Sequence, residues 1–319
     1  MSNVTFLTGL PTIEVLAEMS LDLDGVRGMA RWIKDRRPEC LPDEYDPDTA
    51  SVDANAELAL FPHRGLRHPY RGGALRGEDE QLTDNELLVE LAGRKCYDSF
   101  GLKAGRKSNA EYIEHTQQGE IPHRSIMYHA KLTFFFAGLS RRVSQELMRN
   151  YVGADRDQEG CPSQESTRYT RQTGRYVAHP YLLDKPAELE RWKAGIATSH
   201  AEYEAFIARR VLAFREENGR DPTGADRKHI YEAAIGRLPW EFETSVVWTT
   251  NPAALTKLLI ERDHEGADKE FQRFARYLKL VCVKRAPNLF PRFRDAWADL
   301  NLGTPEGDRL AMHPWPVPL

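Results

Sequence analysis

The chain is poor in cysteine. Its 319 residues include four cysteines, and no pair of them has the C-x-x-C spacing. Structural zinc sites depend on such close pairs, and disulfide scaffolds depend on many cysteines in a short chain. We therefore predict neither a metal site nor a disulfide framework, and we expect most of the thiols to be reduced.

Long apolar runs are missing as well. A membrane-spanning helix needs about 20 consecutive apolar residues, and no run in this chain approaches that length. Residues 1–14 also lack the basic-then-apolar layout of a secretory signal. These two absences predict a cytoplasmic protein that does not enter a membrane.

The chain also shows no internal repeats and no glycine fingerprint, the glycine-rich turn that joins a strand to a helix in βαβ units. Helices are predicted over residues 85–97, 108–118, 186–218, 252–261 and 267–285, with another ending near Gly236, and strands over 132–138 and 240–249. Expected helix caps include Ser108, Ser140 and Asn251, with Gly219 as a stop. Strands that alternate with long helices without that fingerprint predict an α+β fold rather than a doubly wound sheet.

Excess positive charge is lacking overall but present locally. The formal net charge of −4 argues against a protein that coats nucleic acid. Residues 140–176 nevertheless concentrate arginines among serines, threonines, glutamines and tyrosines. Arginine binds phosphate or carboxylate through two parallel hydrogen bonds, so this segment predicts an anion site. A solvated basic face is the alternative interpretation of the same composition.

Helical spacing within this segment places polar residues on a common face. Apolar residues recur at the spacing of one helix face from Ser140 onward, namely Val143, Leu147, Met148 and Tyr151. On such a helix Gln145 and Arg149 share a face, being four residues apart. Ser166 and Arg168 follow in a loop or short strand, so a second group of donors can converge on those of the helix.

Three blocks of this sequence resemble the flavin-dependent thymidylate synthases. SRRVSQELMR and SQESTRY are similar to the family's Arg-His-Arg helix end and its S-x-x-S-x-R-Y stretch. SIMYHAKLTFFFAGLSR (125–141) resembles the S-V-x-E-H-x-x-F-T-F block before it. GRLPWEFETSVVWTTNPAALTKLLIERDHEGADKEF (236–271) resembles the L-P…W-T-x-N…L-x-x-R block after it. Three blocks in the same order are specific, whereas any one alone would be weak.

The resemblance implies a fold, a reaction and a cofactor set. The expected fold is a single α+β domain with a central antiparallel sheet flanked by long helices. Residues 86–319 would form the catalytic domain, with an insertion near 152–162, and residues 1–85 an N-terminal elaboration packed on it. The expected reaction adds a reductive methyl group to C5 of UMP or dUMP, with FAD as cofactor and NADPH and methylenetetrahydrofolate as co-substrates. Family members are homotetramers with active sites between subunits.

The resemblance also assigns roles to single residues. Arg262 matches the arginine placed against the uracil and is the expected catalytic residue. The expected nucleotide-binding residues are Gln145, Arg149, Ser166, Arg168 and Arg262. The expected cofactor-binding residues are His129, Arg149, Asn150, Tyr151, Gln164, Asn251 and Lys257. For three of these a simpler structural role stands beside the functional one: a core histidine for His129, a surface charge for Arg262 and a helix cap for Asn251.

The sequence departs from the family pattern around the expected ligands. Asn150 and Tyr151 replace the histidine and second arginine of Arg-His-Arg, and Ile235 stands where an arginine is expected, with Arg237 as a nearby substitute. These departures favour a specialised pocket, similar to the UMP/dUMP C5-methylase of the polyoxin nucleoside-antibiotic pathway. The alternatives are a standard dUMP-specific thymidylate synthase and a non-catalytic nucleotide- or RNA-binding module. We expect no nucleophilic role for Cys161, because acidic residues flank it and the resembled family uses none.

Overall fold

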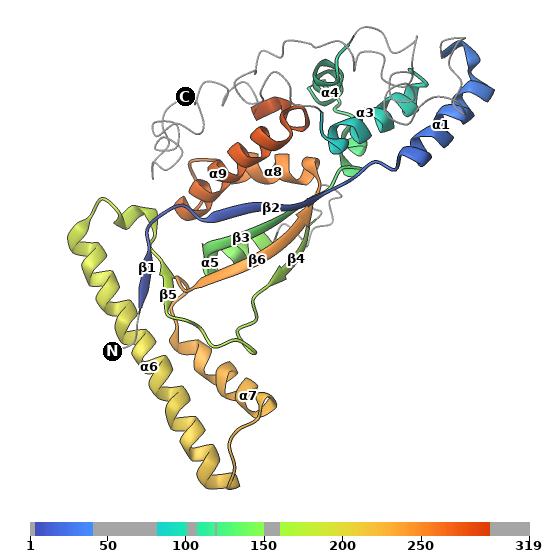
Figure 1. Cartoon of the computed structure of the whole chain (residues 1–319). Helices are drawn as coiled ribbons and strands as arrows, with labels where there is room; N and C mark the ends of the chain where they lie inside the picture. The colour runs from blue at the N-terminus through green and yellow to red at the C-terminus, as the bar shows by residue number, and fades with distance from the viewer. Residues whose placement is uncertain (1–3, 41–81, 101–106, 119, 150–159, 294–319) are drawn as a thin grey trace.

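A computed structural model describes residues 4–40, 82–100, 107–118, 120–149 and 160–293 (Figure 1). Its helices are α1 (Leu23–Arg36), α3 (Asp84–Tyr97), α4 (Asn109–Gln117), α5 (Arg141–Arg149), α6 (Pro186–Asn218), α7 (Gly224–Ala234), α8 (Pro252–Arg262) and α9 (Lys269–Arg285). Its strands are β1 (Thr5–Leu7), β2 (Thr12–Glu18), β3 (Leu132–Ser140), β4 (Gly160–Gln164), β5 (Arg175–Val177) and β6 (Glu243–Thr250). Two short 3₁₀ helices border the functional region, η3 (Arg124–Tyr128) and η6 (Pro287–Leu289). The predicted α+β class is confirmed.

The central sheet has four strands in the order β2-β3-β6-β4, and every neighbouring pair is antiparallel. Strand β3 runs two residues beyond its predicted end, because its pairing with β6 resumes at Leu139 after an irregularity. Gly138 lies at that irregularity with φ of 76°, a conformation that side chains disfavour. This glycine therefore lets β3 deliver Ser140 directly to the start of α5.

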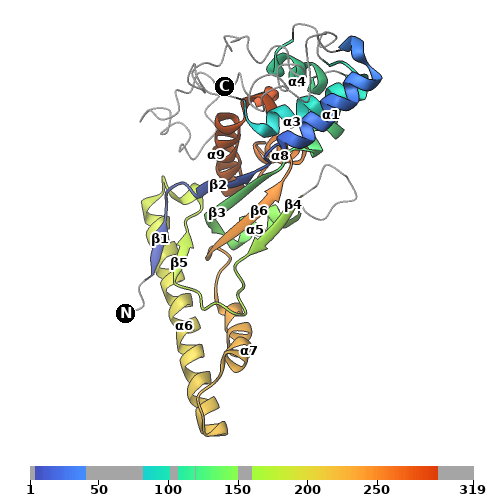
Figure 2. The ribbon, with the colours of Figure 1, turned by 45° about the vertical axis from the view of Figure 1, so that its right-hand side comes forward.

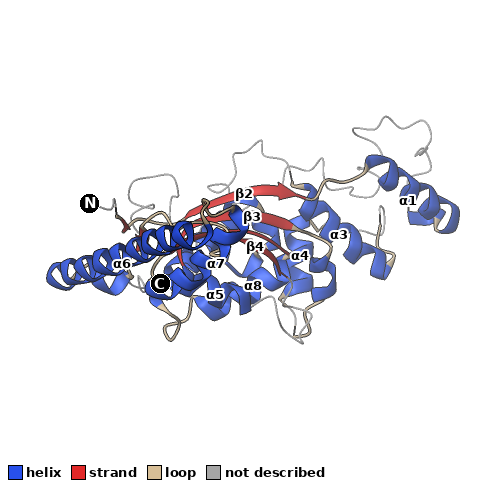
Figure 3. Ribbon diagram, turned by 90° about the horizontal axis from the view of Figure 1, so that it is seen from below, coloured by secondary structure: helices blue, strands red, loops and turns tan. Residues whose placement is uncertain are grey.

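Helices cover one face of the sheet. Alternate residues of β3 and β6 are buried on that face, among them Phe134, Phe136 and Trp248. Phe136 packs edge-on against Phe274 of α9, with ring centroids 5.0 Å apart. Figure 3 shows α5 and α8 on the same side of the strands. The other face is more open, since Val247 is 36% exposed, so the pattern is that of a sheet with one buried face.

Local sequence signals set the ends of most helices. Ser108 and Glu111 form a reciprocal capping box at α4, and Gly219 ends α6 in a left-handed conformation, both as predicted. Helix α9 begins at Lys269 rather than Ala267, because the Asp268 carboxylate accepts hydrogen bonds from the first free backbone N–H groups. Strand β6 begins at Glu243 rather than Trp240, because the chain first turns at Pro239, where the Phe242 N–H donates to the Pro239 carbonyl.

Part of the N-terminal region belongs to the sheet. Strand β2 forms one edge of the sheet beside β3, and β1 pairs in parallel with β5. Helix α1 packs its apolar face on α3 through Val26, Ala30 and Ile33. Residues 41–81 of the expected N-terminal elaboration and residues 294–319 of the expected catalytic domain lie outside the described residues.

Helices α6 and α7 form an arm that projects from the sheet (Figures 1 and 2). Apolar residues of α6, such as Ile196 and Tyr203, are buried against Ile230 of α7 and Phe242. Although α6 has 33 residues, charged side chains are spread along its whole length. In the part of the chain that the structure describes, no helix is long and apolar enough to cross a membrane.

A buried histidine in this arm makes stability depend on pH. His200 is 4% exposed, and its Nδ1 lies 3.0 Å from the Tyr176 hydroxyl. Burial, assisted by the Arg171 charge, lowers the pKa of His200 below its ordinary value. The unfolded chain takes up a proton near pH 6.5, so the stabilisation is complete above that pH and is lost as the pH falls through the folded-state pKa.

We expect the urea midpoint of unfolding to fall between about pH 7.5 and about pH 5.5, and less so in His200→Gln. Glutamine keeps a polar contact with Tyr176 but takes up no proton. An equal pH dependence in both proteins would show that His200 is not the responsible group.

Candidate active site

Helix α5 is anchored at its start by two strong contacts. The Ser140 hydroxyl accepts a hydrogen bond from the Val143 N–H at 3.2 Å, which confirms Ser140 as the cap. The Ser140 N–H in turn donates to Glu270 of α9 at 2.9 Å. The buried side of α5 holds Val143 and Leu147, so Gln145 and Arg149 lie exposed on its outer side. Asn150 and Tyr151, the next two expected cofactor ligands, lie outside the described residues.

Gln164 ends strand β4 and joins it to α5. Its amide nitrogen donates to the Ser144 hydroxyl at 2.7 Å and to the Thr244 hydroxyl at 3.3 Å. Arg141 donates to the same Thr244 oxygen at 3.0 Å, and burial lowers the pKa of its guanidinium. The Gln164 amide nitrogen is therefore used to hold β4, β6 and α5 together. Sequence reasoning missed Ser144 and Thr244, because their partner Gln164 is distant along the chain.

Arg262 lies at the end of α8, directly against α5. Its Nη1 is 2.8 Å from Oε2 of Glu146, and its guanidinium carbon lies 5.1 Å from the centre of the Phe271 ring. Its Nε is buried and has no hydrogen-bond partner in the described parts of the chain. The structure thus brings Arg262 to the helix that carries Gln145 and Arg149. Glu146, which holds it there, was missed by sequence reasoning.

Ser166 and Arg168 lie in the loop that follows β4. The Ser166 hydroxyl accepts a hydrogen bond from the Arg168 N–H at 3.3 Å, which tightens the loop. The Arg168 side chain is half exposed and forms an ion pair with Glu232 of α7. This pair lowers the pKa of Glu232, mainly through the hydrogen bond from Arg168. Arg168 therefore pairs with the arm, whereas Arg262 pairs with α5.

The Arg237 side chain contacts residues of the arm. Its Nη1 donates to the Ala233 carbonyl at 2.8 Å, and its guanidinium carbon lies 3.6 Å from the centre of the Phe206 ring. Its Nε is 3.8 Å from Glu202. All of these contacts lie within the arm, so the Arg237 side chain is held by Ala233, Phe206 and Glu202.

The remaining predicted cofactor residues surround the start of α8. Asn251 is fully buried and accepts a hydrogen bond from the Ala254 N–H at 2.9 Å, so its role as a helix cap is established. His129 is exposed between η3 and β3. Lys257 lines a cavity of about 680 Å³ bordered by α4, η3, α8 and η6.

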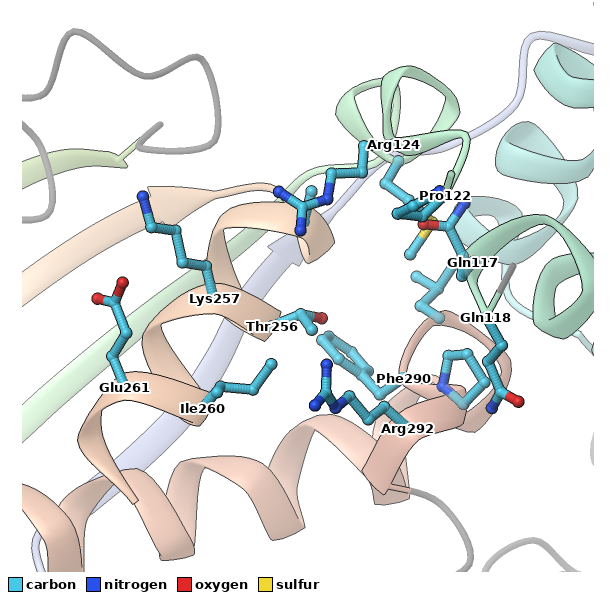
Figure 4. Close-up of a pocket in the computed structure, with 14 residues that line it drawn as sticks. Gln117, Gln118, Pro122, Arg124, Thr256, Lys257, Ile260, Glu261, Phe290 and Arg292 are labelled. Carbon is cyan, nitrogen blue, oxygen red and sulfur yellow. The ribbon is translucent and has the colours of Figure 1, made fainter. Parts of the chain in front are cut away.

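This cavity has cationic sides and apolar walls. Figure 4 shows Arg124, Lys257 and Arg292 coming from three separate segments around it. Apolar wall residues include Met127, Ile260 and Leu289, and the carboxylate at its edge is Glu261. Such a donor set suits a ligand with a phosphate group and a flat apolar ring. No group of His, Cys, Asp or Glu side chains within the described ranges is placed to hold a metal ion.

Known proteins resemble this chain over most of its length. The family model described as thymidylate synthase complementing protein matches residues 80–288, which include η3, β3, α5, β4 and α8. A flavin-dependent thymidylate synthase of Mycobacterium avium (strain 104) is 32% identical over 231 residues, covering 71% of this chain and 84% of the relative. That of Mycobacterium leprae (strain Br4923) is 31% identical over 207 residues, covering 64% and 76%.

The fold is an α+β domain on one antiparallel four-stranded sheet, with cationic residues on α5, on α8 and in the loop after β4. The family match and the two relatives give that class a more specific identity. The chain belongs to the family of flavin-dependent thymidylate synthases.

Proposed function

We propose that this chain transfers a one-carbon unit to C5 of dUMP and reduces it to a methyl group, and that it also accepts UMP. The observation that carries the proposal is Arg262, held between Glu146 and Phe271 beside α5. Guanidinium donors fixed in a partly buried site stabilise the negative charge that develops on a pyrimidine carbonyl during attack at C5. The Arg262 side chain is 23% exposed, so part of its guanidinium can reach a bound ring.

We assign binding of the nucleotide phosphate to the other predicted nucleotide-binding residues. Gln145 and Arg149 present exposed donors on α5, and Ser166 and Arg168 present a second group from the loop after β4. Both groups reach solvent in one chain. This exposure supports a homotetramer in which a neighbouring subunit covers the site, and sedimentation at equilibrium measures that state directly.

The cofactor is FAD, with NADPH as reductant and methylenetetrahydrofolate as carbon donor. The flavin supplies the hydride that no protein side chain can provide. Of the described residues, Arg124, Lys257 and Arg292 would hold its phosphates, and the apolar wall of the cavity would hold a ring. Exposed His129 and the Asn251 cap lie next to two of the segments that border this cavity, η3 and α8.

The decisive test is methylation of UMP and dUMP side by side, with purified protein, FAD, NADPH and methylenetetrahydrofolate. Turnover of both nucleotides is the expected result. Turnover of dUMP alone would identify a standard thymidylate synthase. Protein that stays colourless and takes up no FAD would instead indicate a nucleotide-binding module.

The Arg168–Glu232 ion pair gives a prediction about nucleotide affinity. An incoming phosphate must compete with the Glu232 carboxylate for Arg168, which is half exposed. Glu232→Gln removes the competing charge, so we expect the Kd for dUMP to fall by about two- to fivefold, a modest change typical of exposed pairs. Isothermal titration of FAD-loaded protein measures it.

A matched control removes a neighbouring pair. Glu204→Gln frees Arg171, which pairs with Glu204 on α6, without touching Arg168. This variant is expected to bind dUMP like the parent protein. Tighter binding in both variants would point to a general change in charge rather than to Arg168.

A further inference from the structure

A second hollow, of about 510 Å³, lies beyond the cavity described above. The end of α3, helix α4 and the segment that leads into η3 surround it. The residues on which the inference depends are Tyr97, Lys107, Tyr112, His115, Ile121 and His123. None of the described residues that line it is a carboxylate, and because Arg94 is paired with Glu90, Lys107 supplies its positive charge. Such a lining favours an anion.

Two polar atoms in this hollow are buried without a partner. Tyr112 is 7% exposed, and neither its hydroxyl nor Nδ1 of His123 has a hydrogen-bond partner in the described parts of the chain. Burial raises the pKa of Tyr112 to about 12, so the hydroxyl keeps its proton and can donate. Buried polar groups without a partner are rare in folded proteins and mark places where a ligand or water completes the bonding.

A glycine keeps that hydroxyl in place. A Cβ atom at Gly93 of α3 would lie 2.6 Å from the Tyr112 hydroxyl oxygen, closer than any side chain tolerates. The Arg94 guanidinium lies 4.5 Å from the centre of the Tyr112 ring and is paired with Glu90. The ring is therefore fixed from two sides, and its hydroxyl has a defined position in the hollow.

The rim of the hollow is apolar and exposed. Tyr97 is 68% exposed and packs edge-on against His123, with ring centroids 5.8 Å apart. Ile121 is 91% exposed. Lys107 and His115, also exposed, form no hydrogen bond or ion pair with any residue in the described ranges. A planar ring can rest on such a rim while an anionic group reaches the cations.

The two hollows share a wall. Thr116 and His123 line the second hollow, whereas Gln117 and Arg124, their neighbours in sequence, line the first. The His123 N–H donates to the Thr116 carbonyl at 2.8 Å, and the Gln117 amide donates to the His123 carbonyl at 3.0 Å. These bonds hold the end of α4 against the segment that leads into η3, so the two hollows are neighbours. A molecule bound on one side of it lies beside whatever fills the other.

We propose that the second hollow binds the anionic group and a planar ring of a co-substrate that reacts with the flavin. NADPH and methylenetetrahydrofolate both carry that chemistry. The inference rests on the proposed function, since it assumes FAD in the neighbouring cavity. Lys107 and the Tyr112 hydroxyl bind the anion, and Tyr97 and Ile121 receive the ring.

The test separates the two half-reactions in FAD-loaded protein with Lys107→Glu. The first measurement is anaerobic bleaching of the flavin at increasing NADPH. The second is methyl transfer to dUMP at increasing methylenetetrahydrofolate after the flavin has been reduced with dithionite. We expect the half-saturating concentration of one co-substrate to rise by about tenfold or more, because an attractive charge becomes a repulsive one. The half-reaction that changes identifies which of the two binds there.

Two further variants keep the result unambiguous. Lys284→Glu makes the same charge change on an exposed part of α9 that lines neither hollow, and it should leave both half-reactions unchanged. Tyr112→Phe removes only the hydroxyl and should weaken binding of the same co-substrate. If Lys107→Glu fails to fold, the half-saturating concentrations of this second variant test the inference. Unchanged half-saturation for both co-substrates in folded, FAD-loaded variants would overturn the inference. Failure of the parent protein to take up FAD would overturn the proposed function instead.

Discussion

Arg262→Ala is expected to lower kcat/KM for dUMP by about a hundred- to a thousandfold, the loss that follows removal of one fixed donor to a developing oxyanion. The variant should still bind FAD, because Arg262 does not line the cationic cavity. Steady-state rates with the flavin content measured in parallel give both quantities. Loss of FAD together with activity would mean that Arg262 supports the cavity rather than the uracil.

The contact between Arg262 and Glu146 provides a graded comparison. Glu146→Gln retains a hydrogen-bond acceptor at 2.8 Å from Nη1 but removes the charge. It should reduce kcat much less than Arg262→Ala does, since the arginine stays in place. Arg262→Lys keeps the charge and loses the fork of donors, so it should remain close to the alanine variant. A lysine variant with nearly full activity would contradict a role for directed hydrogen bonds.

Glu90→Ala is expected to lower the free energy of unfolding by about 3 to 5 kcal/mol, since breaking a buried ion pair leaves one charge without compensation. Glu90 and Arg94 are 0% and 1% exposed, with Nε of Arg94 2.7 Å from Glu90. Asn109 of α4 also donates to Glu90 at 2.7 Å. Glu90 therefore also joins α3 to α4 through Asn109. Urea denaturation, analysed by linear extrapolation, measures the change.

The double variant Glu90→Leu with Arg94→Met tests the same explanation. Replacing both charges by apolar side chains of similar volume removes the uncompensated charge, and such replacements are often neutral or stabilising. We expect the double variant to be clearly more stable than Glu90→Ala. Equal loss in both would show that packing or the Asn109 contact, rather than charge, dominates.

The sequence by itself determined most of the helices, the strands β3 and β6, and the family. Helix α6 was predicted from Pro186 to Asn218, and it has those bounds because a proline can start a helix and Gly219 can adopt the left-handed conformation that ends it. Asn251 and Ser108 were predicted as caps for the same kind of local reason. These signals lie within a few residues of their effect, so no tertiary contact is needed to interpret them. The three ordered motif blocks likewise needed only their own residues.

The partners of the site residues were decided by the tertiary structure alone. Arg262 meets Glu146 across 116 residues of chain, and Arg168 meets Glu232 across 64. Sequence spacing carries no information about such contacts, because they arise when α8 and α5 pack on one face of the sheet and the loop after β4 returns to α7. The cationic cavity and the second hollow exist for the same reason. Each is enclosed by segments that become neighbours only when the sheet and its helices are assembled.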